Sequence, residues 1–165
     1  MSLSTPLIQE LEFEAISTRK ALERTPFERF EWQPHEKSLS LGKLASHIAD
    51  IPAWMSVTVP LDEWNVDTSG RPTFAADSTD SLVTTFDKNV AEAKAILSDA
   101  SDETLLGNWK MIMGGNVFLD MPKIAVVRTW VLNHLIHHRG QLTVYLREND
   151  IAVPGIYGGS ADEVA

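Results

Sequence analysis

Apolar residues recur at intervals of three and four positions in four stretches of this chain, and this period constrains the fold most. Such spacing gathers the apolar side chains on one face of a helix. The stretches cover about residues 6–24, 38–57, 78–97 and 122–148. Their stripes include Leu7, Leu11 and Leu22, then Leu41, Leu44 and Ile48, then Leu82, Phe86 and Leu97, and finally Ile124, Val127, Val131, His138 and Tyr145. Four amphipathic helices predict an all-α fold, arranged as a helical bundle.

The segments between these stretches carry turn and loop signals. Pro52 lies inside the second pattern and should kink or split that helix, since proline lacks the backbone donor. Residues 60–77 are polar and read as a long connection, a kind of loop that is often functional. Within residues 105–121, Gly114-Gly115 separates two short apolar runs, which predicts a small β-hairpin inserted before the last helix.

Composition excludes several classes of protein. The 165 residues suit one domain, spanning residues 1–165. A net charge of −9 disfavours nucleic-acid binding, which needs clustered Lys and Arg. No apolar run approaches the roughly 20 residues of a membrane helix, and the first residues lack the pattern of a signal peptide. The absence of cysteine excludes disulfides, thiolate ligands and a cysteine nucleophile, so we expect a cytoplasmic protein with no membrane partner.

Three histidines carry the chemistry that the residues indicate. His134 and His138 lie four positions apart, and on a helix such positions share one face. His47 borders the apolar stripe of another helix and can supply a third nitrogen, which leaves one metal coordination position open, as catalytic sites require. Two alternatives stay open at this point. His137 is also within one turn of His134, and the pair could simply be hydrogen-bonded histidines at a helix edge.

Two polar residues are candidates for supporting roles at such a site. Asp50 follows His47 by three positions and could orient an imidazole, accept a proton or ligate the metal; a solvated carboxylate is the simpler interpretation. Gln141 follows His138 by three positions and could hydrogen-bond a bound water or ligand. Trp54 and Tyr145 could line the pocket. The zinc-protease motif, which needs Glu after the first histidine, is absent because Leu135 follows His134.

The run Leu41-Gly42-Lys43-Leu44-Ala45-Ser46-His47-Ile48-Ala49-Asp50 resembles the first histidine motif of the DinB family. The run Asn133-His134-Leu135-Ile136-His137-His138-Arg139-Gly140-Gln141-Leu142-Thr143-Val144-Tyr145-Leu146-Arg147 is similar to the C-terminal motif of that family, and the tail from Val153 to Asp162 is similar to its ending. The resemblance implies a four-helix bundle in up-down-down-up order. It also implies a divalent metal, most often zinc or nickel, held by His47, His134 and His138, and a tendency to dimerise.

The resemblance extends to thiol-dependent S-transferases and a mycothiol-dependent isomerase, which leads to our first functional hypothesis. We expect a metal-dependent enzyme that transfers a low-molecular-weight thiol to a small-molecule substrate, with Arg139 or Arg147 as candidate contacts for an anionic thiol. A metal-dependent hydrolase is the alternative within the enzyme class. A non-catalytic metal-binding or small-ligand-binding protein of a stress response is the alternative outside it.

A second apolar stripe on the last helix leads to an expectation about assembly. At 100° per residue, Ala125, Leu132, Ile136 and Thr143 fall opposite the histidine-bearing side. A large exposed apolar stripe usually marks an interaction surface. The sequence therefore predicts a homodimer formed partly through this helix, unless the hairpin or the long loop covers the stripe.

Overall fold

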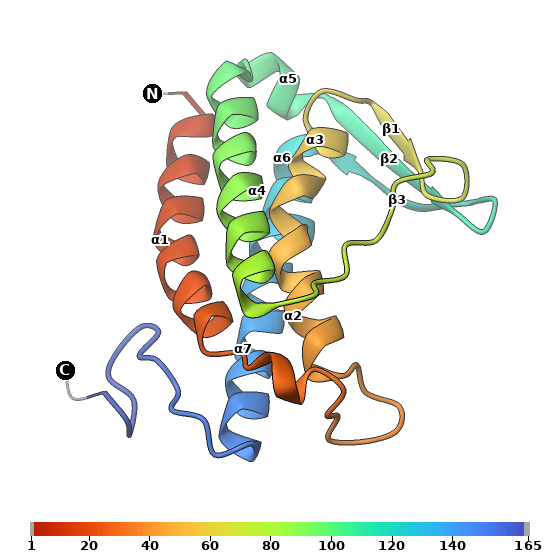
Figure 1. Ribbon diagram of the computed structural model, residues 1–165. Helices are drawn as coiled ribbons and strands as arrows, with labels where there is room; N and C mark the ends of the chain where they lie inside the picture. Colours follow the sequence, from red (N-terminus) through yellow and green to blue (C-terminus); the bar gives the residue numbers. More distant parts are fainter. Residues whose placement is uncertain (1, 164–165) are drawn as a thin grey trace.

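The computed structural model describes residues 2–163, which form a mostly helical fold with one three-stranded sheet (Figure 1). The longest helices are α1 (Ser4–Glu23), α2 (Leu41–Asp50), α4 (Thr79–Asp99) and α7 (Asn133–Glu148). Helix α1 contacts α4 and α7, and α2 contacts the same two helices. Between them lies the main hydrophobic core, which includes Leu11, Leu44, Ile48, Phe86 and Leu135. The expected helices are therefore present, whereas their up-down-down-up order stays a prediction.

Helix α2 brings the first histidine motif into the core, and its two ends follow from local sequence. Ser40 caps its N-terminus by accepting a hydrogen bond from the Lys43 backbone N–H at 3.4 Å. At the other end α2 gives way to a 3₁₀ turn, η2 (Ile51–Trp54), and then to α3 (Met55–Thr58). Because Pro52 cannot donate to the α-helical ladder, the helix changes character at this point, which confirms the expected break.

The last helical stretch is not one regular helix. It consists of α6 (Lys123–Val126), a π-helical segment η3 (Val127–Leu132) and α7. A π-helical turn contains more residues than an α-helical turn, so angles extrapolated at 100° per residue from α7 do not hold before it. Leu132, which we placed on a dimer-forming stripe, is completely buried in the core of the single chain. An exposed Leu132 therefore no longer supports dimerisation, and the homodimer stays a prediction.

The hairpin is present and belongs to a larger sheet. Strands β2 (Asn108–Met113) and β3 (Asn116–Pro122) pair antiparallel. The turn between them is Gly114-Gly115, with φ values of 59° and 73°, a left-handed conformation that glycine adopts without strain. A third strand, β1 (Glu63–Asn65), lies in the supposed long loop and pairs parallel with β2. The expected hairpin insertion in a mostly helical fold is therefore confirmed, and it is extended to a three-stranded sheet because one segment of the crossover pairs with it.

Polar contacts join strand β2 and the first residue of α6 to the end of α3. The Trp109 indole donates to the Val57 carbonyl at 2.9 Å, and the buried Lys123 ammonium donates to the Val59 carbonyl at 2.9 Å. Both acceptors lie at or just beyond the end of α3. Two further short elements, η1 (Phe27–Arg29) and α5 (Asp102–Leu106), complete the fold.

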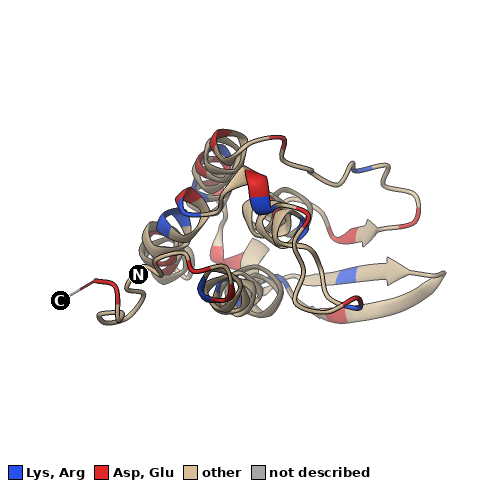
Figure 2. Ribbon diagram, turned by 60° about the horizontal axis from the view of Figure 1, so that its bottom comes forward, with Lys and Arg blue, Asp and Glu red and all other residues tan. Residues whose placement is uncertain are grey.

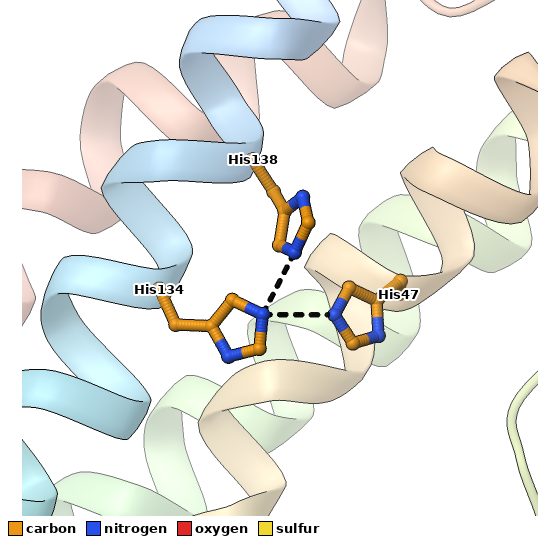
Figure 3. A group of neighbouring side chains, drawn as sticks. All are labelled: His47, His134 and His138. Carbon is orange, nitrogen blue, oxygen red and sulfur yellow. Dashed lines mark hydrogen bonds between the residues drawn. The ribbon is translucent and has the colours of Figure 1, made fainter. Parts of the chain in front are cut away.

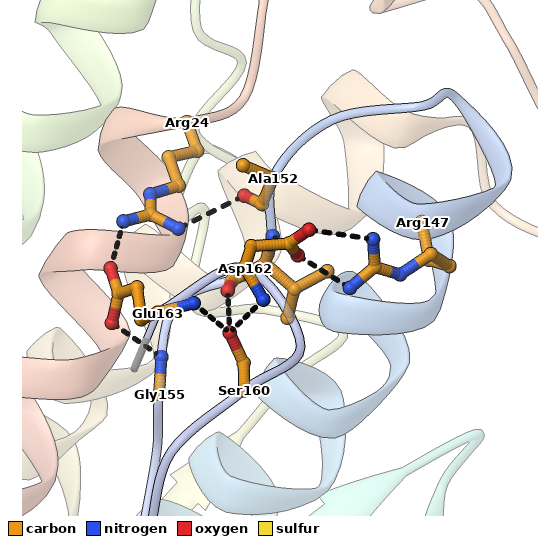
Figure 4. A network of polar contacts seen from close by, with 8 residues as sticks. Arg24, Arg147, Ala152, Gly155, Ser160, Asp162 and Glu163 are labelled. Carbon is orange, nitrogen blue, oxygen red and sulfur yellow. Dashed lines mark hydrogen bonds and ion pairs between the residues drawn. The ribbon is translucent and has the colours of Figure 1, made fainter. Parts of the chain in front are cut away.

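Figure 2 shows positions of Lys and Arg interspersed with positions of Asp and Glu along the helices. The C-terminal tail folds back through ion pairs of Arg24 with Glu163 and of Arg147 with Asp162 (Figure 4). Within residues 2–163, none of the helices has the length and apolar character that crossing a membrane requires.

Candidate metal centre

Three imidazoles from two helices converge at one point in the fold (Figure 3). His47 comes from α2, and His134 and His138 come from successive turns of α7. The Nε2 atoms of His47 and His134 are 3.3 Å apart, and those of His134 and His138 are 2.7 Å apart. All three candidate ligand atoms lie within 4.8 Å of one another. The two motifs, more than eighty positions apart in the chain, therefore form one cluster.

This cluster is compatible with a divalent metal ion in donor type, and one of its nitrogen pairs has the spacing of a zinc site. Nitrogens bound tetrahedrally to zinc at about 2.0–2.1 Å are separated by about 3.3 Å, which is close to the separation in the His47–His134 pair. Imidazole nitrogen suits zinc, nickel and other borderline metals. Among residues 2–163 no carboxylate joins the group, so three neutral ligands would leave a coordination position for a water or substrate.

The surroundings keep these imidazoles neutral. Burial lowers the pKa of His134 to about 4, and the neighbouring His138 and His47 imidazoles act in the same direction. Burial also lowers the pKa values of His47 and His138 below their usual range. A metal ion binds only the neutral imidazole. At neutral pH the three rings are therefore uncharged, which is the form that offers a nitrogen lone pair to a metal ion.

The depressed pKa of His134 predicts how the metal-free protein responds to acid. In the unfolded chain this imidazole takes up a proton near pH 6.5, whereas in the folded protein it does so near pH 4. Between these values the unfolded state binds more protons, so the free energy of unfolding falls as the pH drops from about 6.5 to about 4 and then levels off. Urea titrations of chelator-treated protein at a series of pH values measure this slope. His134→Gln should flatten it; an equal slope in that variant would contradict the assignment.

Comparisons with known proteins identify the family of this chain. The sequence model of the DinB family matches residues 1–165. The chain belongs to the DinB family. The uncharacterised protein YrdA of Bacillus subtilis (strain 168) is 30% identical over 164 residues, covering 96% of this chain and 90% of YrdA. The resemblance seen in the motifs is thereby confirmed.

Solved structures of two DinB-like proteins share the fold. A DinB-like protein from Bacillus cereus ATCC 10987 is 29% identical, with a TM-score of 0.67 over 92% of this chain and 95% of that one. The DinB-like protein YjoA of Bacillus subtilis is 19% identical, with a TM-score of 0.69 over 92% of this chain and 97% of that one. The second comparison supports the fold alone.

In this DinB-family chain, the Gln141 side chain contacts the imidazole of His138. The Nδ1 of His138 lies 2.7 Å from the Gln141 side-chain oxygen, which accepts the ring proton. A partner on one ring nitrogen fixes the tautomer and turns the other nitrogen, Nε2, into the lone-pair donor. This contact places Gln141 where it can orient His138, whereas its expected hydrogen bond to a bound water or ligand stays a prediction.

Within residues 2–163, Asp50 is not among the grouped metal-ligand candidates, and its hydrogen bonds go to other residues. Its two carboxylate oxygens each accept a hydrogen bond from Arg71 at 2.8 Å, and the Trp54 indole donates to it at 3.3 Å. Arg71 comes from the segment that we read as a connecting loop, and no local pattern pointed to it. The ion pair between Asp50 and Arg71 thus holds the segment around Arg71 against α2.

Two tryptophan rings, those of Trp54 and Trp130, lie beside the His134 imidazole in this chain. The Trp54 ring lies 5.1 Å from the His134 ring and 5.5 Å from the His47 ring. The Trp130 ring lies 5.6 Å from the His134 ring. Trp54 was among the expected pocket residues, whereas Trp130 was not, although its position four residues before His134 could have indicated it.

The remaining candidates lie outside the cluster. His137 is exposed and contributes no atom to the group, and Tyr145 packs edge-on against Trp32 at 5.4 Å. Arg139 is buried in an ion pair with Glu14, and Arg147 pairs with Asp162. Both arginines that we considered for an anionic thiol are therefore already engaged.

Proposed function

We propose that this DinB-family protein is a divalent-metal-dependent enzyme, with zinc or nickel held by His47, His134 and His138, that transfers a low-molecular-weight thiol to an electrophilic small molecule. The observation that carries the proposal is the convergence of three neutral imidazoles, within 4.8 Å, with no fourth protein ligand among the described residues. A closed structural site would supply four ligands, whereas a catalytic site keeps one position for the reacting molecule.

A divalent metal in this position supplies Lewis acidity, which lowers the pKa of a thiol or water at its open site. The protein's own residues orient one of the metal ligands and shield another from solvent. Gln141 holds His138 in the tautomer that presents Nε2, and Trp54 and Trp130 exclude water from one side of His134. The chain has no cysteine, so the thiol must be a cosubstrate. In the net reaction the sulfur forms a bond to the electrophilic carbon, and the leaving group departs with the thiol proton.

The surroundings of Asp50 favour a transferase over a hydrolase. A hydrolase benefits from a protein base that takes a proton from the attacking water. Asp50 is the nearest carboxylate along α2, and it is held by Arg71 and Trp54 instead. A thiol has a pKa near 8.5 and ionises close to neutral pH without such a base.

The test is a transfer assay with the metal-loaded protein. Thiol consumption and thioether formation are followed by mass spectrometry across a panel of thiols and halogenated or epoxide acceptors. We expect turnover with zinc or nickel, and loss of turnover in His138→Ala and in chelator-treated protein. A protein that binds the metal tightly but forms no thioether with any pair would favour the non-catalytic alternative.

A further inference from the structure

A hollow of about 630 Å³ opens beside His47 of α2, and neither His134 nor His138 of α7 lines it. Ligand pockets commonly have volumes of about 300–1,000 Å³ and mainly apolar walls. The apolar walls of this one come from Phe30, Leu39, Phe74, Ala75 and Ala76. Its size and lining therefore suit a small organic molecule, placed next to a candidate metal ligand.

The segment that closes the hollow is fixed to α2 at two points. Arg71 binds both carboxylate oxygens of Asp50 at 2.8 Å, and the Ala76 backbone N–H donates to the Ser46 hydroxyl at 3.0 Å. The Arg71–Asp50 pair is mostly shielded from solvent. Residues 71–76 are thus held as a wall, so a ligand would enter a hollow that is already formed, with little ordering cost.

One side of the hollow carries three polar groups from a single helical face. Lys43, Ser46 and His47 all line it, at positions i, i+3 and i+4 of α2, which are neighbours on a helix surface. Among the described residues Lys43 has no ion-pair partner, and the proton of the buried Ser46 hydroxyl has no assigned acceptor. The second ring nitrogen of His47, Nδ1, points away from the other imidazoles and has no hydrogen-bond partner within residues 2–163 (Figure 3).

We propose that this hollow binds the acceptor substrate, a small molecule with an apolar body and one carboxylate, whose carboxylate is held by Lys43, Ser46 and His47. Three donors without acceptors match the lone pairs of one carboxylate. Glu31 lines the same hollow and adds one negative charge, which disfavours a dianion such as a phosphate monoester. The inference rests on the proposed function in one respect, since a metal on His47 Nε2 keeps the ring proton on Nδ1.

The experiment compares three probes that share one apolar body: naphthylacetate, its neutral amide naphthylacetamide and the cation naphthylethylamine. Each is titrated calorimetrically into metal-free and zinc-loaded protein. We expect naphthylacetate to bind about tenfold more tightly than the amide, because charge-assisted hydrogen bonds are the stronger ones. The amine should bind most weakly. Zinc should increase the preference for the carboxylate, because it adds positive charge beside His47.

Two substitutions that remove charges of opposite sign test whether naphthylacetate binds in the hollow. Lys43→Gln should remove most of the preference for naphthylacetate over the amide, whereas Glu31→Gln should increase naphthylacetate affinity about twofold. Lys37→Gln removes the same charge from an exposed position that does not line the hollow, so it is the matched control and should change nothing. Zinc titrations of all three variants should match those of the unsubstituted protein.

The outcomes separate this inference from the proposed function. Equal affinity for naphthylacetate and the amide, an unchanged preference in Lys43→Gln, or no binding of any probe overturns the carboxylate site, whatever the zinc titration shows. A protein that fails to bind zinc but keeps the Lys43-dependent preference overturns the metal-dependent function and leaves the hollow as a carboxylate-binding site.

Discussion

Replacing either His134 or His138 with alanine should abolish tight metal binding, whereas replacing His137 should leave it intact. The Nε2 atoms of His134 and His138 lie 2.7 Å apart and face His47, while His137 is exposed and outside the group. Loss of a direct ligand should cost more than the roughly 10–100-fold loss that follows removal of an outer partner. Competition with a chromophoric chelator measures the affinity for zinc and nickel in each variant.

Gln141→Leu provides a graded comparison in the same assay. This change leaves all three imidazoles but removes the acceptor that holds His138 in one tautomer. We expect an affinity between those of the unsubstituted protein and His138→Ala. Circular dichroism checks that each variant keeps its helices. If His138→Ala bound metal as tightly as the unsubstituted protein while His137→Ala did not, the pair His134 and His137 would be the ligands instead.

The sequence predicted those parts of the fold that short-range periodicity determines. Stripes such as Leu82, Phe86 and Leu97 define α4 because helix formation depends on neighbours three and four positions away. Pro52 and Gly114-Gly115 likewise act through local backbone constraints. Strand β1 was not predictable in this way. Its three residues carry no periodic pattern, and it exists because it pairs with Lys110–Ile112 in β2, far along the chain.

In the candidate site, too, local spacing predicted some features, whereas others depend on contacts between distant segments. The i,i+4 spacing of His134 and His138 puts both imidazoles on one face, so their proximity follows from the helix alone. Their meeting with His47 follows from helix packing, which the family resemblance implied and the spacing did not. The partners of Asp50 and Arg139 were missed for a physical reason. Each is an ion pair between distant segments, and neither Arg71 nor Glu14 lies in a local pattern that marks it.

The pair Glu14–Arg139 is the main polar feature of the core between α1 and α7. The two side chains are only 7% and 2% exposed, and their charged atoms are 2.6 Å apart. Arg139 also donates to the Ser17 hydroxyl at 2.6 Å and to the Tyr157 hydroxyl at 2.7 Å. The Tyr157 hydroxyl in turn donates to the Glu14 carboxylate. Helix α1, helix α7 and the C-terminal tail thus share one polar network, which is buried at Glu14 and Arg139 and ends at the exposed Tyr157.

Removing one member of this network should cause a large loss of stability. Glu14→Leu leaves the Arg139 guanidinium buried without its counter-ion, and breaking a buried pair in this way costs about 3–5 kcal/mol. For a domain of this size, that corresponds to a decrease in melting temperature of roughly 6–20 °C. Thermal and urea unfolding measure the change. The half-buried pair Arg24–Glu163, which links the tail to α1, is the control (Figure 4), and Arg24→Gln should cost no more than about 1 kcal/mol.

The double variant Glu14→Leu/Arg139→Met decides whether the pair stabilises the protein or only penalises its own disruption. Replacing both charges with apolar side chains of similar volume removes the desolvation cost of each ion, so the double variant should recover most of the stability that Glu14→Leu loses. It should also bind zinc, because His138 is held by Gln141 and not by Arg139. If the double variant proved no more stable than Glu14→Leu, the loss would come from packing around Ser17 and Tyr157, and the unpaired guanidinium would not be its cause.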